Sequence, residues 1–411
     1  MTREVAMGTG TRRTGGALAL GAAVAGLGAG AGWLWRHQAE IAFSRPVNEW
    51  AFTHMSAVLP TEPVARAATP RPLPSAPGLH GFAYEHDGER RTLAQLHART
   101  HTTGFAVLHR GVLVREEYPG RFASPQARFQ LFSLTKSVTS MLIGIALEEG
   151  ALGSLDDKVV TLLPQLAGSA YDGPTVGDLL HMSSGVGFVE DYADPHSSFA
   201  RFERAVSGGG SLLEVVRSLP RAAEPGGTFN YSTVDSQVLG WVLEAATGTT
   251  LAQYAHSRLW SRIGAERDAY YFLTRGRPRT ALGGGSLNAA VRDMARIGLL
   301  MARGGELDGQ RIVPAAWVGR SRGAGLPHLD VGALGPDFPR HYGYANQWWT
   351  LGGERRSFTG IGIHGQYLWV DPEADVVVVK TSAWNTAEDE ARDAETVAAL
   401  RALVTHLETA G

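Results

Sequence analysis

The sequence predicts an α+β fold, in which strands from both chain ends form one antiparallel sheet flanked by helices, with a mostly helical region inserted between them. Two strand hairpins, near residues 110 and 372, predict the sheet, and the stretch 152–264 between them has mostly helical patterns. With 44% hydrophobic and 19% charged residues, the 411-residue chain has the composition of a globular protein.

The first hairpin precedes a long helix. Residues 104–108 and 112–117 are rich in β-favouring residues and flank a turn that ends in Gly111. A helix is predicted over 133–149, because apolar residues recur there at helical spacing and Gly150 ends the pattern.

The remaining elements complete this pattern. Another helix is predicted over 287–303. Two strong strand patterns, 366–370 and 375–380, form the second hairpin around 371–374, and a helix over 386–407 closes the chain. The strands near the two chain ends are therefore expected to share one sheet.

The first 46 residues are interpreted as a targeting segment, and 47–411 as one folded domain. An uncharged run from 14 to 35 follows three arginines, and at about 1.5 Å per residue it is long enough to cross a bilayer. An uncleaved membrane anchor, a cleaved signal peptide and a disordered tail stay open, and the first two place the domain outside the cytoplasm. Residues 47–59 are expected to wrap onto the domain, and six prolines in 60–77 predict an extended connector.

Charge and cysteine content exclude several classes of protein. The formal net charge is −2, whereas nucleic-acid-binding proteins need a basic surface. The chain has no cysteine, which excludes disulfides, thiolate catalysis, cysteine-ligated zinc and iron–sulfur clusters. His97 and His101 are four residues apart but have no evident third ligand near them. We therefore expect neither a metal nor a cofactor.

Ser133 and Lys136 form a Ser-x-x-Lys motif at the start of the predicted helix 133–149. Three residues are just under one helical turn, so both side chains lie on one face and Lys136 leans back over Ser133. A lysine whose pKa is lowered by burial can take the serine proton, whereas an arginine cannot. Only three of the 38 basic residues are lysines, which favours a titrating role for Lys136. The motif alone is weak, since a helix cap beside a surface charge has the same sequence.

Further segments strengthen this interpretation: 132–137, 155–158, 175–185, 229–232, 239–241 and 283–287. Their order and spacing resemble those of the serine β-lactamase-like hydrolases, which include class C β-lactamases, DD-peptidases, family VIII esterases and the nylon-oligomer (6-aminohexanoate-dimer) hydrolases. The resemblance covers roughly residues 47–411 and implies the serine β-lactamase/transpeptidase-like fold. It is closest to the nylon-oligomer branch, through 190–192, 343–344, 348–349 and 364–367.

The resemblance also implies roles for other residues. Tyr231 corresponds to the family's second-motif tyrosine, which shares a proton network with the lysine and the nucleophile. We assign the third motif to 358–360, because it precedes both strands of the second hairpin. The backbone N–H groups of Ser133 and Ile361 would then form the oxyanion hole. The similar stretch 380–382 is rejected, because only the final helix follows it.

Two departures from the family affect the expected substrate. Phe358 stands where relatives usually have a cation, and Thr233 replaces the asparagine of the usual Tyr-x-Asn. Both changes disfavour a substrate that is recognised through its carboxylate. We expect Tyr192, Phe358, Gly360 and Trp348 to bind substrate, although a core position for Trp348 stays open.

The sequence therefore predicts a serine hydrolase that cleaves esters or linear amides through an acyl-enzyme on Ser133. Its partner is a small-molecule ester or amide and no nucleic acid, the N-terminal segment would meet a membrane, and the oligomeric state stays open. The alternatives are a β-lactamase or DD-carboxypeptidase on the same scaffold, and a non-catalytic scaffold or ligand-binding protein. The acidic residues Glu190, Asp191 and Asp194 are interpreted as a solvated loop.

Overall fold

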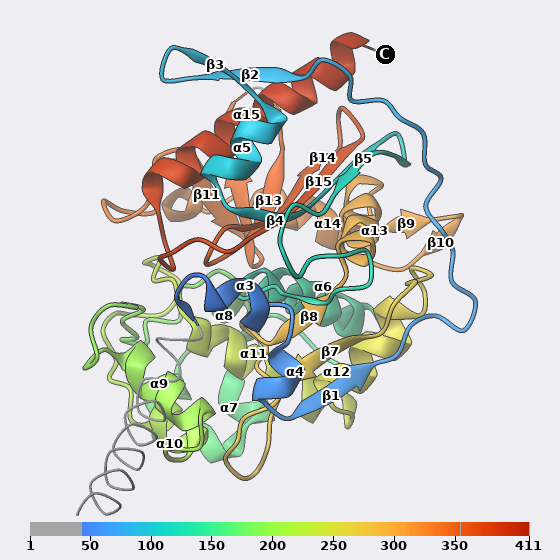
Figure 1. Cartoon of the computed structure of the whole chain (residues 1–411). Helices are drawn as coiled ribbons and strands as arrows, with labels where there is room; N and C mark the ends of the chain where they lie inside the picture. Colours follow the sequence, from blue (N-terminus) through green and yellow to red (C-terminus); the bar gives the residue numbers. More distant parts are fainter. Residues whose placement is uncertain (1–42, 354, 411) are drawn as a thin grey trace, which may run out of the picture.

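A seven-stranded antiparallel sheet is the centre of the computed structural model, which describes residues 43–353 and 355–410. Its strands are β4 (Thr102–His109), β5 (Val112–Glu117), β11 (Tyr342–Ala345), β12 (Trp348–Leu351), β13 (Phe358–Gly362), β14 (Gln366–Asp371) and β15 (Val376–Ser382). They lie in the order β11-β12-β13-β14-β15-β4-β5, so the two chain ends meet where β15 pairs with β4 (Figure 1). The predicted α+β fold and the shared sheet are confirmed.

Both predicted hairpins are present. In the turn between β4 and β5, Arg110 and Gly111 have φ angles of 53° and 79°, the left-handed values that a type I′ turn requires at its two central positions. In β15, four successive valines, 376–379, are all buried. A strand can be apolar on both sides only where both faces of the sheet are covered.

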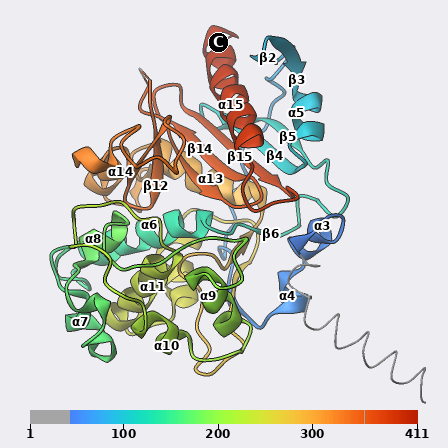
Figure 2. The same ribbon diagram turned by 90° about the vertical axis from the view of Figure 1, so that its left-hand side faces the viewer.

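Helices provide that cover. Helices α6 (Leu134–Glu148) and α13 (Val291–Ala302) pack on one face, and α5 (Leu93–Arg99) and α15 (Glu390–Ala410) pack on the other (Figure 2). The predicted helix 133–149 is confirmed as α6. The predicted helix over 287–303 is wrong at its start, because β8 (Leu287–Ala289) pairs with two other strands before α13 begins. The last helix begins at Glu390 rather than at 386.

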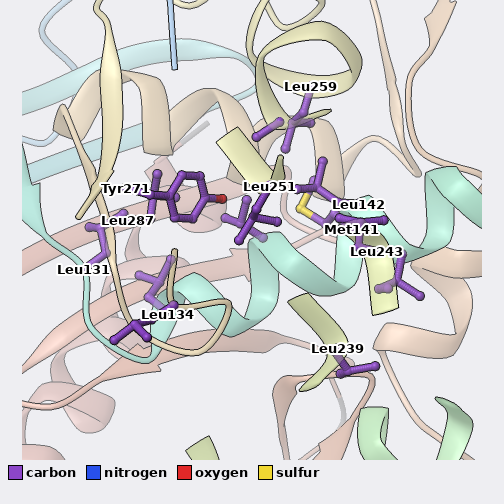
Figure 3. Close-up of a cluster of buried hydrophobic side chains, with 14 of the residues drawn as sticks. Leu131, Leu134, Met141, Leu142, Leu239, Leu243, Leu251, Leu259, Tyr271 and Leu287 are labelled. Carbon is purple, nitrogen blue, oxygen red and sulfur yellow. The ribbon is translucent and has the colours of Figure 1, made fainter. Parts of the chain in front are cut away.

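The inserted helical region lies against α6. Its helices are α7 (Val159–Leu162), α8 (Val176–Leu180), α9 (Ser198–Val206), α10 (Leu212–Arg217), α11 (Thr233–Thr247) and α12 (Leu251–Ala255). Leucines of α11 and α12 meet Leu134, Met141 and Leu142 of α6 in one apolar cluster (Figure 3). Every residue of α6 from Leu134 to Ala146 is buried. The helix that carries the Ser-x-x-Lys motif is therefore held on all sides.

Several short elements complete the chain. They are β2 (Ala83–His86), β3 (Glu89–Thr92), β9 (Glu306–Leu307), β10 (Gln310–Arg311), α14 (Ala315–Ser321), η1 (Pro164–Leu166), η2 (Ala170–Asp172), η3 (His256–Trp260) and η4 (Pro327–Leu329).

The N-terminal part of the domain packs onto its body through α3 (Val47–Ala51), α4 (Met55–Val58) and β1 (Thr61–Val64). Strand β1 is an edge strand of a second, four-stranded sheet with β7 (Ala269–Phe272), β8 and β6 (Phe129–Gln130), in the order β1-β7-β8-β6. This sheet was not predicted, because its strands have only two to four residues. Part of the predicted connector 60–77 is thus a hydrogen-bonded strand, and Pro63 is tolerated there because the strand lies at an edge.

The predicted targeting segment 1–46 lies outside the described residues, apart from its last four positions. Within the described part of the chain, no helix is both long enough and apolar enough to span a bilayer. The membrane anchor and the signal peptide therefore stay predictions.

Candidate active site

Ser133 lies in the turn that leads from β6 into α6. The residue before it, Phe132, has a φ of 48°, a left-handed value that bulky side chains rarely adopt and that is common at functional sites. Phe52, which follows α3, meets the Phe132 ring edge-on with 4.8 Å between centroids. Ala51 and Ile363 pack in the same small cluster. The N-terminal extension thus supports the strained turn that presents Ser133.

Lys136 lies one turn further along α6 and is only 1% exposed. Its Nζ donates to Ser133 Oγ at 2.7 Å, to Thr233 Oγ1 at 2.8 Å and to the carbonyl oxygen of Gly284 at 2.9 Å. Burial lowers the pKa of Lys136 from 10.5 to about 8, and the Glu190 carboxylate acts in the opposite direction. The structure therefore brings the predicted serine and lysine into direct contact, with the lysine able to lose its proton near neutral pH.

Tyr231 lies beside Lys136, two residues before α11. The Nζ of Lys136 is 4.9 Å from the centroid of the Tyr231 ring. Burial and then the charge of Glu190 raise the pKa of Tyr231 well above 10, while a hydrogen bond with Ser133 acts in the opposite direction. The phenol therefore keeps its proton across the neutral range. Its ring also stacks on Trp349, with 5.3 Å between centroids.

Glu190 belongs to this site, although its acidic surroundings in the sequence predict a solvated loop. Its carboxylate accepts hydrogen bonds from the backbone N–H and the hydroxyl of Thr233, both at 2.7 Å, and from the hydroxyl of Tyr192 at 2.6 Å. The earlier interpretation is therefore wrong for Glu190, whereas Asp191 and Asp194 are exposed. The resemblance of 190–192 to a family segment was the available signal, but it could not show which helix end this carboxylate would meet.

Strand β13 runs beside the start of α6 and approaches it closely through two glycines. A Cβ at Gly360 would lie 3.0 Å from Ser137 Oγ and 3.2 Å from Leu134 Cγ. A Cβ at Gly362 would collide with the carbonyl oxygen of Leu131. The small size of Gly360 is therefore explained by packing against α6, and a contact between Gly360 and substrate stays a prediction.

The open edge of β13 offers two backbone N–H groups. The Leu351 N–H donates to the carbonyl oxygen of Ser357, so the N–H groups of odd-numbered residues in β13 point toward β12. The pairing with β12 stops at Thr359, which leaves the N–H of Ile361 without a strand partner. The N–H of Ile363 also makes no hydrogen bond to any described residue. Ile361 stays the predicted oxyanion donor beside Ser133, and Ile363 is a second candidate that the motif assignment missed.

The prediction that Phe358 and Trp348 bind substrate is wrong. Both side chains are 0% exposed, and their rings meet at 5.1 Å in the core on the α6 face of the sheet. Because successive side chains of a strand point to opposite faces, the next residue, Trp349, lies on the other side and stacks on Tyr231. Trp349 is thus the tryptophan of this site. Tyr192 is linked to this site by the hydrogen bond that its hydroxyl donates to Glu190. A contact between Tyr192 and substrate stays a prediction.

Lys380, in the rejected third-motif stretch, lies in the middle of the sheet. It is 0% exposed, and its Nζ donates to Ser382 Oγ at 2.6 Å and lies 5.7 Å from the ring centroids of Tyr367 and Trp384. These rings belong to the cluster on the α15 face, so Lys380 points away from α6. In the part of the chain that the structure describes, no three His, Asp or Glu side chains are grouped to hold a metal ion.

Comparison with known proteins shows where this chain has relatives. The sequence model of the Beta-lactamase family matches residues 90–403. The 6-aminohexanoate-dimer hydrolase of Paenarthrobacter ureafaciens is 34% identical over 350 residues, which are 82% of this chain and 86% of that protein.

Solved structures agree with this relationship. A Bacillus anthracis protein, provisionally described as a 6-aminohexanoate-dimer hydrolase, has a TM-score of 0.80 and 27% identity over 90% of this chain and 96% of its own. EstCE1, a hydrolase with promiscuous acyltransferase activity, shares the fold with a TM-score of 0.59 and 18% identity, over 75% of this chain and 96% of its own. These matches confirm the resemblance inferred from the sequence.

Proposed function

The chain belongs to the Beta-lactamase family, and on that premise we propose that it is a serine hydrolase that cleaves esters or linear amides through an acyl-enzyme on Ser133. The observation that carries the proposal is the 2.7 Å contact between Ser133 Oγ and Lys136 Nζ. Since the pKa of Lys136 is about 8, a useful fraction of the lysine is neutral at physiological pH and can act as the general base.

In the acylation step, neutral Lys136 accepts the hydroxyl proton of Ser133 while Oγ attacks the carbonyl carbon of the substrate. The N–H of Ser133, with that of Ile361 or Ile363, stabilises the negative charge on the carbonyl oxygen. When the tetrahedral intermediate collapses, the proton passes from Lys136 through Tyr231 to the leaving alcohol or amine. An ester between the acyl group and Ser133 remains.

In the deacylation step, a water molecule attacks this ester. Lys136, with Tyr231, takes the proton of the water and returns a proton to Ser133 Oγ as the carboxylic acid departs. The same groups therefore serve both half-reactions, and the enzyme regains its starting protonation state.

The charges near Ser133 disfavour recognition of a substrate through a carboxylate next to the scissile bond. Among the described residues, Lys136 is the only lysine or arginine with a hydrogen bond or ring contact to Ser133, Tyr231 or Glu190. A substrate carboxylate beside these three residues would meet the negative charge of Glu190. The name of the 34% identical relative, a 6-aminohexanoate-dimer hydrolase, supports a linear amide.

The test uses the full chain and its Ser133→Ala variant. We expect a fluorophosphonate probe to label the wild type and not the variant; equal labelling of both would refute Ser133 as the nucleophile. We also expect kcat/KM for p-nitrophenyl butyrate to exceed that for a chromogenic cephalosporin on the same preparation. The reverse order would favour β-lactam or cell-wall chemistry, and the absence of both labelling and turnover would favour a non-catalytic role.

A further inference from the structure

Glu190 touches neither Ser133 nor Lys136, yet it is bound to the residue that contacts the lysine. We propose that Glu190 is a positioning residue. It fixes the direction of the Thr233 hydroxyl, so that the lone pair of neutral Lys136 points toward Ser133. The inference rests on the proposed function, because it assigns Lys136 as the base.

The contacts of Glu190 are short and specific. One carboxylate oxygen accepts the hydroxyl protons of Thr233 and Tyr192 at 2.7 and 2.6 Å, and the other accepts the backbone N–H of Thr233 at 2.7 Å. Thr233 is the first residue of the 15-residue helix α11. The unpaired N–H groups and the positive end of the helix dipole favour a carboxylate at this place.

The hydroxyl of Thr233 has only one proton, and Glu190 accepts it. The oxygen of this hydroxyl must therefore accept in its 2.8 Å contact with Lys136. The carbonyl oxygen of Gly284, at 2.9 Å from Lys136 Nζ, can also only accept.

These hydrogen-bond donors and acceptors determine where the lone pair of Lys136 points. A neutral amine has two N–H donors and one lone pair, and the two donors are taken by Thr233 and Gly284. The lone pair then occupies the third direction and accepts the hydroxyl of Ser133, whereas the protonated lysine donates to the same oxygen at 2.7 Å. If residue 190 could not accept a hydrogen bond, the Thr233 hydroxyl could turn and donate to this lone pair, which would block the base.

The charge of Glu190 has a second effect. It favours the protonated form of Lys136, so it raises the pKa that burial lowers. The titratable groups whose pKa values respond to Glu190 are Lys136, Tyr192, Glu203, Tyr231, Asp235, Tyr344 and Glu388. Glu388 is exposed and has no hydrogen bond to Thr233, which makes it a matched control for a nearby negative charge.

The first test compares Glu190→Gln with Glu190→Ala in the full chain. Gln keeps an acceptor for the Thr233 hydroxyl but loses the charge, so the rising limb of kcat/KM against pH should move down by about one pH unit, with a plateau within tenfold of wild type. Ala has no acceptor, and its plateau should fall about 10- to 100-fold. Glu388→Gln should leave the rising limb in place.

The second test compares a conservative and a non-conservative substitution of Thr233. Thr233→Ser retains a hydroxyl between Lys136 and Glu190 and should keep a plateau within about threefold of wild type. Thr233→Val removes the acceptor for one N–H of Lys136, so the lone pair is no longer directed at Ser133 and the plateau should fall about 10- to 100-fold. Melting temperatures show whether any loss reflects unfolding. An unchanged limb in Glu190→Gln, or wild-type plateaus in Glu190→Ala and Thr233→Val, would overturn the inference.

A measurement without turnover separates this inference from the proposed function. The chain has three lysines, Lys136, Lys158 and Lys380, so NMR of protein labelled with ¹³C at lysine Cε should show three side-chain resonances. The resonance absent from Lys136→Arg belongs to Lys136, and its pKa should fall in Glu190→Gln. No fall would refute the coupling of Glu190 to Lys136, whereas a fall in a protein that hydrolyses nothing would refute only the proposed function.

Discussion

The pH dependence of hydrolysis follows directly from the burial of Lys136. The proposed base, Lys136, must be neutral to accept a proton, and with a pKa of about 8 its neutral fraction is about 9% at pH 7 and about 91% at pH 9. The value of kcat/KM for p-nitrophenyl butyrate should therefore rise about tenfold between pH 7 and 9 and then level off. A lysine with the ordinary pKa of 10.5 would still give a rise of about tenfold per pH unit at pH 9. The pKa of Tyr231 lies well above 10, so the phenol should not lower the rate in this range.

The assay is initial-rate hydrolysis by the full chain from pH 6 to 9.5, with the rate of the Ser133→Ala variant subtracted at each pH. Lys136→Arg keeps the positive charge but cannot lose it, so kcat/KM should fall by about 10²- to 10⁴-fold. Lys158 is exposed, and Lys158→Arg should reproduce the wild-type profile. A rate that is flat from pH 6 to 9, or a Lys136→Arg variant with wild-type activity, would refute the assignment of Lys136 as the base.

Three further predictions concern the scaffold. Phe52→Ala removes the ring that packs on Phe132, so it should lower the unfolding free energy by about 3 kcal/mol and lower kcat. Phe122 is exposed, and Phe122→Ala should change neither quantity. Retained stability and kcat in Phe52→Ala would contradict the supporting role of Phe52. Gly360→Ala places a Cβ 3.0 Å from Ser137 Oγ and should destabilise the protein by about 1–3 kcal/mol in chemical denaturation. The control is Gly319→Ala, whose Cβ has no neighbour within 4 Å. Equal stability of the two variants would show that β13 can move away from α6. Burial lowers the pKa of Lys380 from 10.5 to about 7, so the unfolded chain binds more protons between these values and stability should rise with pH there. Lys380→Met should therefore raise the melting temperature most at pH 6 and least near pH 10, and a pH-independent difference would be evidence against this origin.

Local patterns were sufficient for much of the fold and for the contact between Ser133 and Lys136. Arg110-Gly111 between two strand patterns predicted a hairpin, because its turn depends on the residues within it. Ser133 and Lys136 are three residues apart on one helix, so helical geometry alone places them on one face. The resemblance to a family then added Tyr231, which lies beside Lys136 as expected.

The errors arose where sequence neighbours have different environments. Trp348 and Trp349 are adjacent and of one type, and only the position of the sheet between two clusters decides that Trp348 is core and Trp349 stacks on Tyr231. Phe358 was assigned to the motif position where relatives usually have a cation, yet it packs in the core against Trp348. The strand 287–289 was predicted as helix, because three residues are too short for a period and their pairing partners lie far away in the chain.

The sequence by itself determined the α+β class, the hairpins, the helix with the Ser-x-x-Lys motif and the family, because these depend on periodicity, turn chemistry and motif spacing within short stretches. Only the tertiary structure decided that Glu190 reaches the start of α11, that Thr233 lies between this carboxylate and Lys136, and that the edge of β13 beside Ser133 is open. Each of these features joins segments that are distant along the chain. Their side chains meet because the apolar faces of the helices and the sheet are buried together, and no local pattern contains that information.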